Sequence, residues 1–147
     1  RLEPLLFEND RAFFKDFAHS PSKVKATTKA IKNQFKNRKL ITLLELHTFS
    51  SLNENFIGEY RDTLESADIK ILFYDPSAAE KKGLKNISET KIKNAFNDNN
   101  LIVFSNSNLL MNFLKEQEYV NSNLLFMSSG NYASLNLDEI KDLVKNS

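Results

Sequence analysis

Short apolar runs alternate along the chain with segments whose hydrophobic residues recur every three or four positions. Four runs rich in Ile, Val, Leu and Phe are predicted to be buried strands: Leu40–Leu46, Ile69–Tyr74, Leu101–Phe104 and Leu124–Met127. A weaker run, Ala12–Phe17, predicts one more strand. The hydrophobic residues are nearly continuous within each run, as in a parallel sheet that is covered on both faces.

The segments between these runs have the spacing and the start signals of helices. Ser20 followed by Pro21 is typical of a helix start and predicts a helix over 21–35. Phe56, Tyr60 and Leu64 are spaced by four and predict a helix over 53–66. Further helices are predicted after three residues that can cap a helix: Ser88, Ser107 and Asn136. The remaining stretch, Asp75–Ile87, contains proline, glycine and several lysines and is predicted to be a surface loop.

Strand and helix are thus expected in strict alternation, which builds βαβ units. Right-handed crossovers between such units give a three-layer, Rossmann-like α/β fold, with an open, mostly parallel sheet and helices on both faces. The chain has 147 residues, of which 41% are hydrophobic and 27% charged. These values are close to those of an ordinary globular domain, so residues 1–147 are expected to form one domain.

Charge and cysteine content exclude several classes of function. Lys and Arg number 20 against 19 for Asp and Glu, so the net charge is only +1 and nucleic acid is not an expected partner. No apolar run approaches the roughly 20 residues of a membrane span, and residues 1–30 lack a signal peptide's apolar core, so a cytoplasmic protein without membrane contact is expected. Without cysteine and with two histidines, no metal site is expected. The first residue is Arg1 rather than Met, which favours a piece of a longer protein.

Ligands of open α/β sheets bind beyond the carboxyl ends of the strands, where both histidines of this chain are expected. Five polar segments follow the predicted strands: Asp16–Ser20, His47–Ser51, Asp75–Ser77, Ser105–Ser107 and Ser128–Asn131. Most of their Ser and Asn residues are interpreted as turn and cap residues. His19 and His47 fit either a ligand contact or a buried, hydrogen-bonded imidazole, and Asp16 fits either a ribose contact or a backbone contact. Glu45, inside an apolar strand, is expected to have a partner or to mark the sheet's edge near the ligand.

Several catalytic motifs are missing from the sequence. The three glycines, Gly58, Gly83 and Gly130, cannot form a dinucleotide fingerprint or a G-x-x-x-x-G-K-[ST] phosphate loop. No G-x-S-x-G elbow is present either. The chain alone is therefore expected to hold no catalytic residues and to bind no cofactor.

Two segments, Lys15–Pro21 and Glu45–Ser50, resemble the C-terminal domain of Mur ligases, the ATP-dependent amide ligases that build peptidoglycan precursors. In the UDP-N-acetylmuramate branch this domain opens with an Arg-x-Glu hinge and contains an Asp-Asp-Phe/Tyr-Ala/Gly-His-His-Pro turn. It also has a strand that ends in Glu-Pro-His/Arg and a late Ser/Gly-x-Gly-Asn/Gly turn. The hinge is similar to Arg1–Glu3 and the late turn to Ser128–Asn131, so the resemblance covers nearly the whole chain.

The resemblance implies a third domain of a longer enzyme. The first domain would hold the UDP-sugar, and the central domain would carry the phosphate loop with ATP and Mg²⁺, so this chain alone would be inactive. ATP would phosphorylate the muramoyl carboxylate, the incoming amine would attack the acyl phosphate, and closure of the third domain would exclude water. By motif position, the nucleotide contacts would be Arg1 and Asp16. The contacts of the amino-acid or peptide substrate would be His19, His47, Thr48, Ser51, Gly130 and Asn131.

Departures from the family pattern bear on the amine. Lys15, Ser20 and Leu46 replace Asp, His and Pro, and Ser51 stands where alanine-adding enzymes have an arginine. The segment Phe126–Tyr132 is more similar to the branch that joins L-alanyl-γ-D-glutamyl-diaminopimelate to UDP-N-acetylmuramate, which favours that tripeptide over L-alanine. A tripeptide brings extra carboxylates, and the cations to test are Lys15, Arg38 and the lysines at 81–85.

Two other classes of function compete with this one. A free-standing α/β binding or signalling module would use the same crevice without chemistry. An autonomous hydrolase is the third hypothesis and has the least support in the residue inventory.

Overall fold

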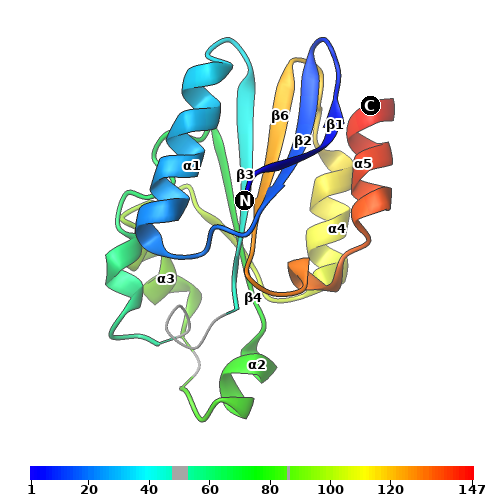
Figure 1. Cartoon of the computed structure of the whole chain (residues 1–147). Coiled ribbons are helices and arrows are strands. Elements are labelled where there is room, and N and C mark those ends of the chain that lie inside the picture. Colours follow the sequence, from blue (N-terminus) through cyan, green and yellow to red (C-terminus); the bar gives the residue numbers. More distant parts are fainter. Residues whose placement is uncertain (48–52, 86) are drawn as a thin grey trace.

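The computed structural model describes residues 1–47, 53–85 and 87–147. Within these ranges, six strands form one sheet in the order β1-β2-β6-β3-β4-β5. The strands are β1 (Glu3–Phe7), β2 (Arg11–Asp16), β3 (Lys39–Leu46), β4 (Ile69–Tyr74), β5 (Ile102–Phe104) and β6 (Ser122–Met127). All neighbouring pairs are parallel except β1 with β2. The predicted mostly parallel α/β sheet is confirmed (Figure 1).

Helices cover both faces of the sheet, as predicted (Figure 1). α1 (Pro21–Gln34) and α3 (Glu89–Phe96) pack on one face together with the 3₁₀ turn η1 (Ile57–Tyr60). α4 (Ser107–Glu116) and α5 (Leu137–Asn146) pack on the other, and η2 (Tyr132–Ser134) precedes α5.

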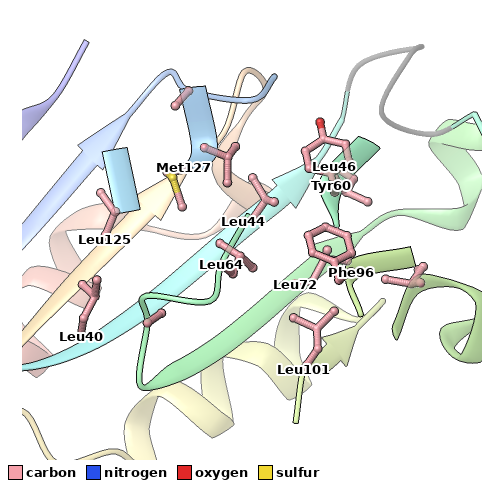
Figure 2. Packing of buried hydrophobic residues seen from close by; sticks show 14 of the residues in the cluster. Leu40, Leu44, Leu46, Tyr60, Leu64, Leu72, Phe96, Leu101, Leu125 and Met127 are labelled. Atoms are coloured by element: carbon pink, nitrogen blue, oxygen red, sulfur yellow. The ribbon is translucent and has the colours of Figure 1, made fainter. Parts of the chain in front are cut away.

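Side chains of the central strands alternate between the two faces. In β3, Leu40 and Leu44 belong to the cluster under α1, and Ile41 and Leu43 belong to the cluster under α4 and α5. Figure 2 shows Leu40, Leu44 and Leu46 along the strand, with other buried side chains around them. Because both faces are buried, β3 carries apolar residues at consecutive positions. By the same alternation, the side chain of Glu45 faces α4 and α5.

The prediction of a helix over 53–66 is wrong. Only Ile57–Tyr60 is helical, as a 3₁₀ turn, and the chain continues through turns to residue 66. Asp62 has φ of 60°, in the left-handed region, where its backbone N–H donates to the carbonyl of Phe96. A left-handed residue cannot continue a right-handed helix. The apolar spacing still marked the buried side, since Tyr60 and Leu64 are almost fully buried.

The expected surface loop at Asp75–Ile87 contains a helix, α2 (Pro76–Lys81). The carboxylate of Asp75 accepts hydrogen bonds from the backbone N–H and the hydroxyl of Ser77, and Pro76 occupies the first helical position. An N-cap followed by proline is a helix-start signal, which the glycine and the lysines of this segment obscured.

The other helix starts match the sequence with one correction. Ser88 and Asn136 cap α3 and α5, and Ser20 precedes α1 without a side-chain cap bond. The N-cap of α4 is Asn106, whose side chain accepts from the N–H of Leu109. Ser107 is instead the first helical residue, and its hydroxyl donates to the carbonyl of Ala133.

Strand and helix do not alternate strictly. β2 follows β1 directly, the described residues between β3 and β4 contain only the 3₁₀ turn η1, and both α2 and α3 lie between β4 and β5. Of these elements, β1 was not predicted. It pairs antiparallel with β2 at the edge of the sheet, and most of its side chains are exposed or half-buried. An exposed edge strand needs no continuous apolar run and so leaves a weak pattern in the sequence.

Candidate functional site

Three polar segments that are distant in sequence meet at the carboxyl ends of the central strands. β6 lies between β2 and β3, and Met127 is in register with Asp16 on one side and with Leu44 on the other. After β2 and β3 the chain passes to the face of α1 and α3, whereas after β6 it passes to the face of α5 (Figure 1). Such divergence marks the usual ligand crevice of an open α/β sheet.

Asp16 ends β2 and is almost fully buried. Its Oδ1 accepts a hydrogen bond of 2.8 Å from the N–H of Ala18, and its Oδ2 accepts one of 3.4 Å from the hydroxyl of Thr27. The backbone nitrogen of Arg1 lies 3.3 Å from Oδ1. A pocket of about 320 Å³ opens beside this carboxylate, lined among others by Arg1, Asp16, Phe17, His19, Lys23 and Thr27. The two predicted nucleotide contacts, Arg1 and Asp16, thus lie together.

His19 lies in the same pocket and is held on both sides. Its Nδ1 is 2.8 Å from the carbonyl oxygen of Phe17, and its ring meets the Phe17 ring edge-on at 5.6 Å. The carbonyl of His19 accepts a hydrogen bond from the hydroxyl of the buried Tyr60. Since a carbonyl oxygen only accepts, Nδ1 carries a proton, and Nε2 of the neutral ring is the acceptor.

His47 follows β3, and its ring packs directly against Gly130 of the β6–α5 loop. A Cβ at Gly130 would lie 2.4 Å from Cγ, 2.5 Å from Cδ2 and 2.8 Å from Nδ1 of His47. Only glycine permits this approach. The carbonyl of His47 accepts a 2.6 Å hydrogen bond from Nζ of Lys82, just after α2.

The carboxylate of Glu45 joins the end of β3 to the β6–α5 loop. Glu45 is 3% exposed, and its Oε1 accepts a hydrogen bond from the hydroxyl of Ser128. Its Oε2 accepts a 3.0 Å hydrogen bond from the N–H of Ala133. The hydroxyl of Ser128 in turn accepts from the N–H of Gly130 at 2.9 Å. Of the two alternatives for Glu45, the partner is confirmed; β3 lies between β6 and β4, so Glu45 is on a central strand and not at the sheet's edge.

A second, smaller cavity of about 60 Å³ lies beside this carboxylate, between the ends of β3 and β4. Its lining includes Glu45, His47, Asp75, Ser107, Asn131 and Ser134. The structure therefore brings Asn131 beside His47 in this cavity, while His19 lines the larger pocket with Asp16. Two further predicted contacts, Thr48 and Ser51, lie outside the described residues.

Three consecutive residues of η2 have left-handed backbone, and nothing in the sequence predicts this. Tyr132, Ala133 and Ser134 have φ of 55°, 58° and 58°, and none is glycine. Two hydrogen bonds to Ala133 hold this turn. The N–H of Ala133 donates to the carboxylate of Glu45, and the carbonyl of Ala133 accepts from the hydroxyl of Ser107. Positive φ at Tyr, Ala and Ser leaves no signal in the sequence, because it is imposed by tertiary hydrogen bonds.

The candidate cations are distributed over both ends of the sheet. Lys15 lies 3.6 Å from a carboxylate oxygen of Glu3 and 5.9 Å from the centre of the Tyr132 ring. The pKa of Tyr132 itself is raised by burial and by the nearby carboxylates of Asp16, Glu3 and Glu45. Arg38 lies at the opposite end of the sheet, before the start of β3, where it donates to the side chain of Asn123 and the carbonyl of Asn9. Arg38 is thus far from the strand-end crevice, whereas Lys82 lies beside it.

Two kinds of feature are absent from residues 1–47, 53–85 and 87–147. No group of three or more His, Asp or Glu side chains there could hold a metal ion. No helix in the same ranges has the length and hydrophobicity to cross a membrane.

No family model matches the chain. A UDP-N-acetylmuramate–L-alanine ligase of Sulfurihydrogenibium is 31% identical over 120 residues, covering 78% of this chain and 26% of that enzyme. A second enzyme with the same name, from Fusobacterium nucleatum, is 29% identical over 82% of this chain and 25% of its own length. The chain thus spans about a quarter of the length of the curated relatives it matches.

Solved structures share the fold at low sequence identity. The murein peptide ligase of Psychrobacter arcticus has a TM-score of 0.68 and 18% identity, over 95% of this chain and 28% of that one. A domain assigned to a UDP-N-acetylmuramate:L-alanyl-γ-D-glutamyl-diaminopimelate ligase of Haemophilus ducreyi has a TM-score of 0.61 and 20% identity, over 97% of this chain and 99% of that one. From its sequence relatives and its α/β architecture, the chain belongs to the Mur ligase family and has the fold of the family's C-terminal domain.

Proposed function

We propose that this chain is the third, substrate-recognising domain of an ATP-dependent, ADP-forming ligase. The enzyme would join the amine of an amino acid or peptide to the carboxylate of UDP-N-acetylmuramate. The observation that carries the proposal is the 31% identity over 120 residues to an enzyme named for this substrate. The strand-end crevice, with Asp16 and His19 in one pocket and His47 and Asn131 in another, supports it.

In the proposed enzyme, two other domains of the same polypeptide are the partners of this chain. The sequence holds no phosphate loop, so the central domain would bind ATP and Mg²⁺, and the first domain would bind the UDP-sugar. The isolated chain is then expected to hydrolyse no ATP. Metal-dependent ATP hydrolysis by the pure chain would contradict this division of labour.

The two pockets are suited to different parts of the reaction. Arg1 and Asp16 would contact the nucleotide at the larger pocket. His19, which the family resemblance assigns to the amine, lines this same pocket and would contact the part of the amine substrate nearest the nucleotide. His47, Gly130 and Asn131 would form the wall for the incoming amine, with Thr48 and Ser51 contributing from the segment that follows β3. A wall of this kind would hold the amine in line with the acyl phosphate, and domain closure would keep water away from that intermediate.

The proposed amine substrate is the tripeptide L-alanyl-γ-D-glutamyl-diaminopimelate rather than L-alanine. Ser51 replaces the arginine of alanine-adding enzymes, and the segment Phe126–Tyr132 is more similar to the tripeptide branch. Lys82, whose ammonium group reaches the end of β3, is a cation suited to the extra carboxylates of a tripeptide. The relatives named above include ligases of both kinds.

The deciding experiment is a ligation assay on the longer protein that contains this chain. UDP-N-acetylmuramate, ATP and Mg²⁺ are supplied with either L-alanine or the tripeptide, and ADP release and product mass are measured. We expect product with the tripeptide. Product with L-alanine alone would move the protein to the alanine-adding branch, and product with neither would favour a binding module without catalysis.

A further inference from the structure

Glu45 carries a buried carboxylate, and within the described part of the chain its hydrogen bonds go to the β6–α5 loop. It is preceded and followed by leucines in a strand that is otherwise fully buried beyond its first residue. Burying a carboxylate is costly unless hydrogen bonds compensate it. Here its two oxygens accept from Ser128 and Ala133, at the start and near the end of the β6–α5 loop. The carboxylate therefore acts as a clamp that spans the loop.

The clamp fixes two features that do not form readily by themselves. One is the left-handed turn at Tyr132–Ser134, where each non-glycine residue adopts an unfavourable backbone conformation. The other is the backbone of Gly130, whose N–H donates to the Ser128 hydroxyl that Glu45 accepts from. Because the ring of His47 rests on Gly130, the position of the ring depends on where this loop lies.

We propose that Glu45 is the positioning residue of the amine subsite: through Ser128 and Ala133 it sets the Gly130 backbone that orients the His47 ring. The inference rests on the proposed function, because only a ligase has an amine to position. Glu45 lines the cavity beside His47, but it is 3% exposed and each of its oxygens already accepts a hydrogen bond, so we assign it a positioning role rather than a contact with the amine.

A carboxylate suits this place because it offers only acceptors. The hydroxyl of Ser128 and the N–H of Ala133 both donate, and Oε1 and Oε2 receive one bond each. Glu45→Met has a similar volume and removes both acceptors. Glu45→Gln keeps one acceptor for Ala133, and its NH₂ group can donate to the Ser128 hydroxyl. The clamp therefore predicts a graded series, with the glutamine variant between wild type and the methionine variant.

The clamp is tested first on this chain by amide hydrogen exchange, a measurement that does not depend on enzymatic activity. In Glu45→Met the amide of Ala133 is expected to exchange about tenfold faster, as for the loss of one hydrogen bond. Amides in α1, on the opposite face of the sheet, should keep their wild-type rates. Unchanged exchange at Ala133 would overturn the clamp.

The positioning role is tested in the longer protein by the KM for its amine substrate. Glu45→Met is expected to raise this KM by about tenfold or more, because displacing a binding group by about 1 Å is costly. The KM values for ATP and UDP-N-acetylmuramate should stay unchanged, and Glu45→Gln should lie in between. Glu45→Met leaves the Ser128 hydroxyl and the Ala133 N–H without their acceptor, so its fold is checked by circular dichroism before the KM is measured. Glu45→Gln keeps one acceptor and carries the test if the methionine variant does not fold.

A matched control separates positioning from general destabilisation. Ile41→Val lies on the same strand and the same face, four residues before Glu45 and far from the loop. It should lower stability slightly and leave every KM at its wild-type value.

The possible failures are distinguishable. An active ligase whose amine KM does not change in Glu45→Met overturns the role of Glu45 and leaves the proposed function standing. A wild-type protein that ligates neither amine overturns the proposed function, and the positioning role falls with it.

Discussion

Replacing Gly130 by alanine is the sharpest test of the contact between the β6–α5 loop and His47. The added Cβ would lie 2.4 Å from Cγ of His47, whereas carbon atoms in ordinary contact are about 3.5–4.0 Å apart. The ring or the loop must therefore move by roughly 1.1 Å or more. The N–H of Gly130 is bonded to Ser128, which Glu45 holds in turn, so we expect the ring to move.

The expected cost follows from the overlap. Forcing an extra methyl group into a packed contact costs about 1–3 kcal/mol. For a chain of this length 1 kcal/mol corresponds to about 2–4 °C in Tm, so Gly130→Ala should lower Tm by roughly 2–12 °C. The assay is thermal unfolding of the chain, followed by circular dichroism, with the NMR signals of the His47 ring as a local measure.

Two controls make the interpretation specific. Gly58→Ala places its Cβ in open space, with nothing within 4 Å, and should leave Tm unchanged or raise it slightly. In a His47→Ala background the overlap no longer exists, so the cost of Gly130→Ala should largely disappear. An undiminished cost in that background, or a Gly130→Ala variant with wild-type Tm and unmoved His47 signals, would refute the reasoning.

Three further predictions concern other parts of the molecule. Partial burial raises the pKa of Asp68, but hydrogen bonds from Lys32 and from a backbone N–H lower it by a larger amount. The pKa of Asp68 therefore lies below its ordinary value. The charge of Asp68 therefore stabilises the fold above the unfolded pKa of about 3.9, and this stabilisation is lost as the pH falls through the folded pKa. In urea unfolding at pH 7, Asp68→Asn should be less stable than wild type. The difference in stability should shrink in acid. Tyr119→Phe removes the hydroxyl that donates to the carbonyl of Leu114 at 2.6 Å. That carbonyl still accepts from the N–H of Gln117, so the cost in the same assay should be about 0.5–1.5 kcal/mol, and an unchanged urea midpoint would contradict this. In the longer protein, His47→Ala should lower kcat/KM for the amine while thermal unfolding shows an intact fold, and unchanged kinetics would remove His47 from the site.

The strands could be predicted from sequence because the sheet is covered on both faces. β3, for example, is buried at every position after Lys39, so its sequence is a nearly continuous apolar run. β1 lacks this pattern because it lies at an exposed edge. For the segment 53–66 the sequence predicted an element that does not form. Its apolar side chains are spaced as in a helix and are buried, but the backbone that carries them forms turns. The spacing identifies which side chains are buried, and the left-handed Asp62 decides that they do not form a helix.

The candidate site was predictable to the extent that it depends on strand ends. Asp16 and His47 follow apolar runs, and Glu45 stands out as a charged residue inside one. The division of the histidines between two pockets was not predictable, because it depends on the strand order, in which β6 separates β2 from β3. The left-handed turn at Tyr132–Ser134 was also hidden, because the contacts that impose it come from residues 45 and 107.

The β6–α5 loop contacts both halves of the crevice and therefore links them. At its start, the N–H of Ser128 donates to the carbonyl of Asp16 at 3.0 Å, and the hydroxyl of Tyr132 reaches the same carbonyl at 3.4 Å. Toward its end, the N–H of Ala133 donates to Glu45. A shift of this loop would therefore move groups in the pocket of Asp16 and in the cavity of His47 together. If nucleotide and amine occupy these two places, as we propose, the loop connects their binding sites through hydrogen bonds to both, and holding it in place would hold the two substrates in position relative to each other.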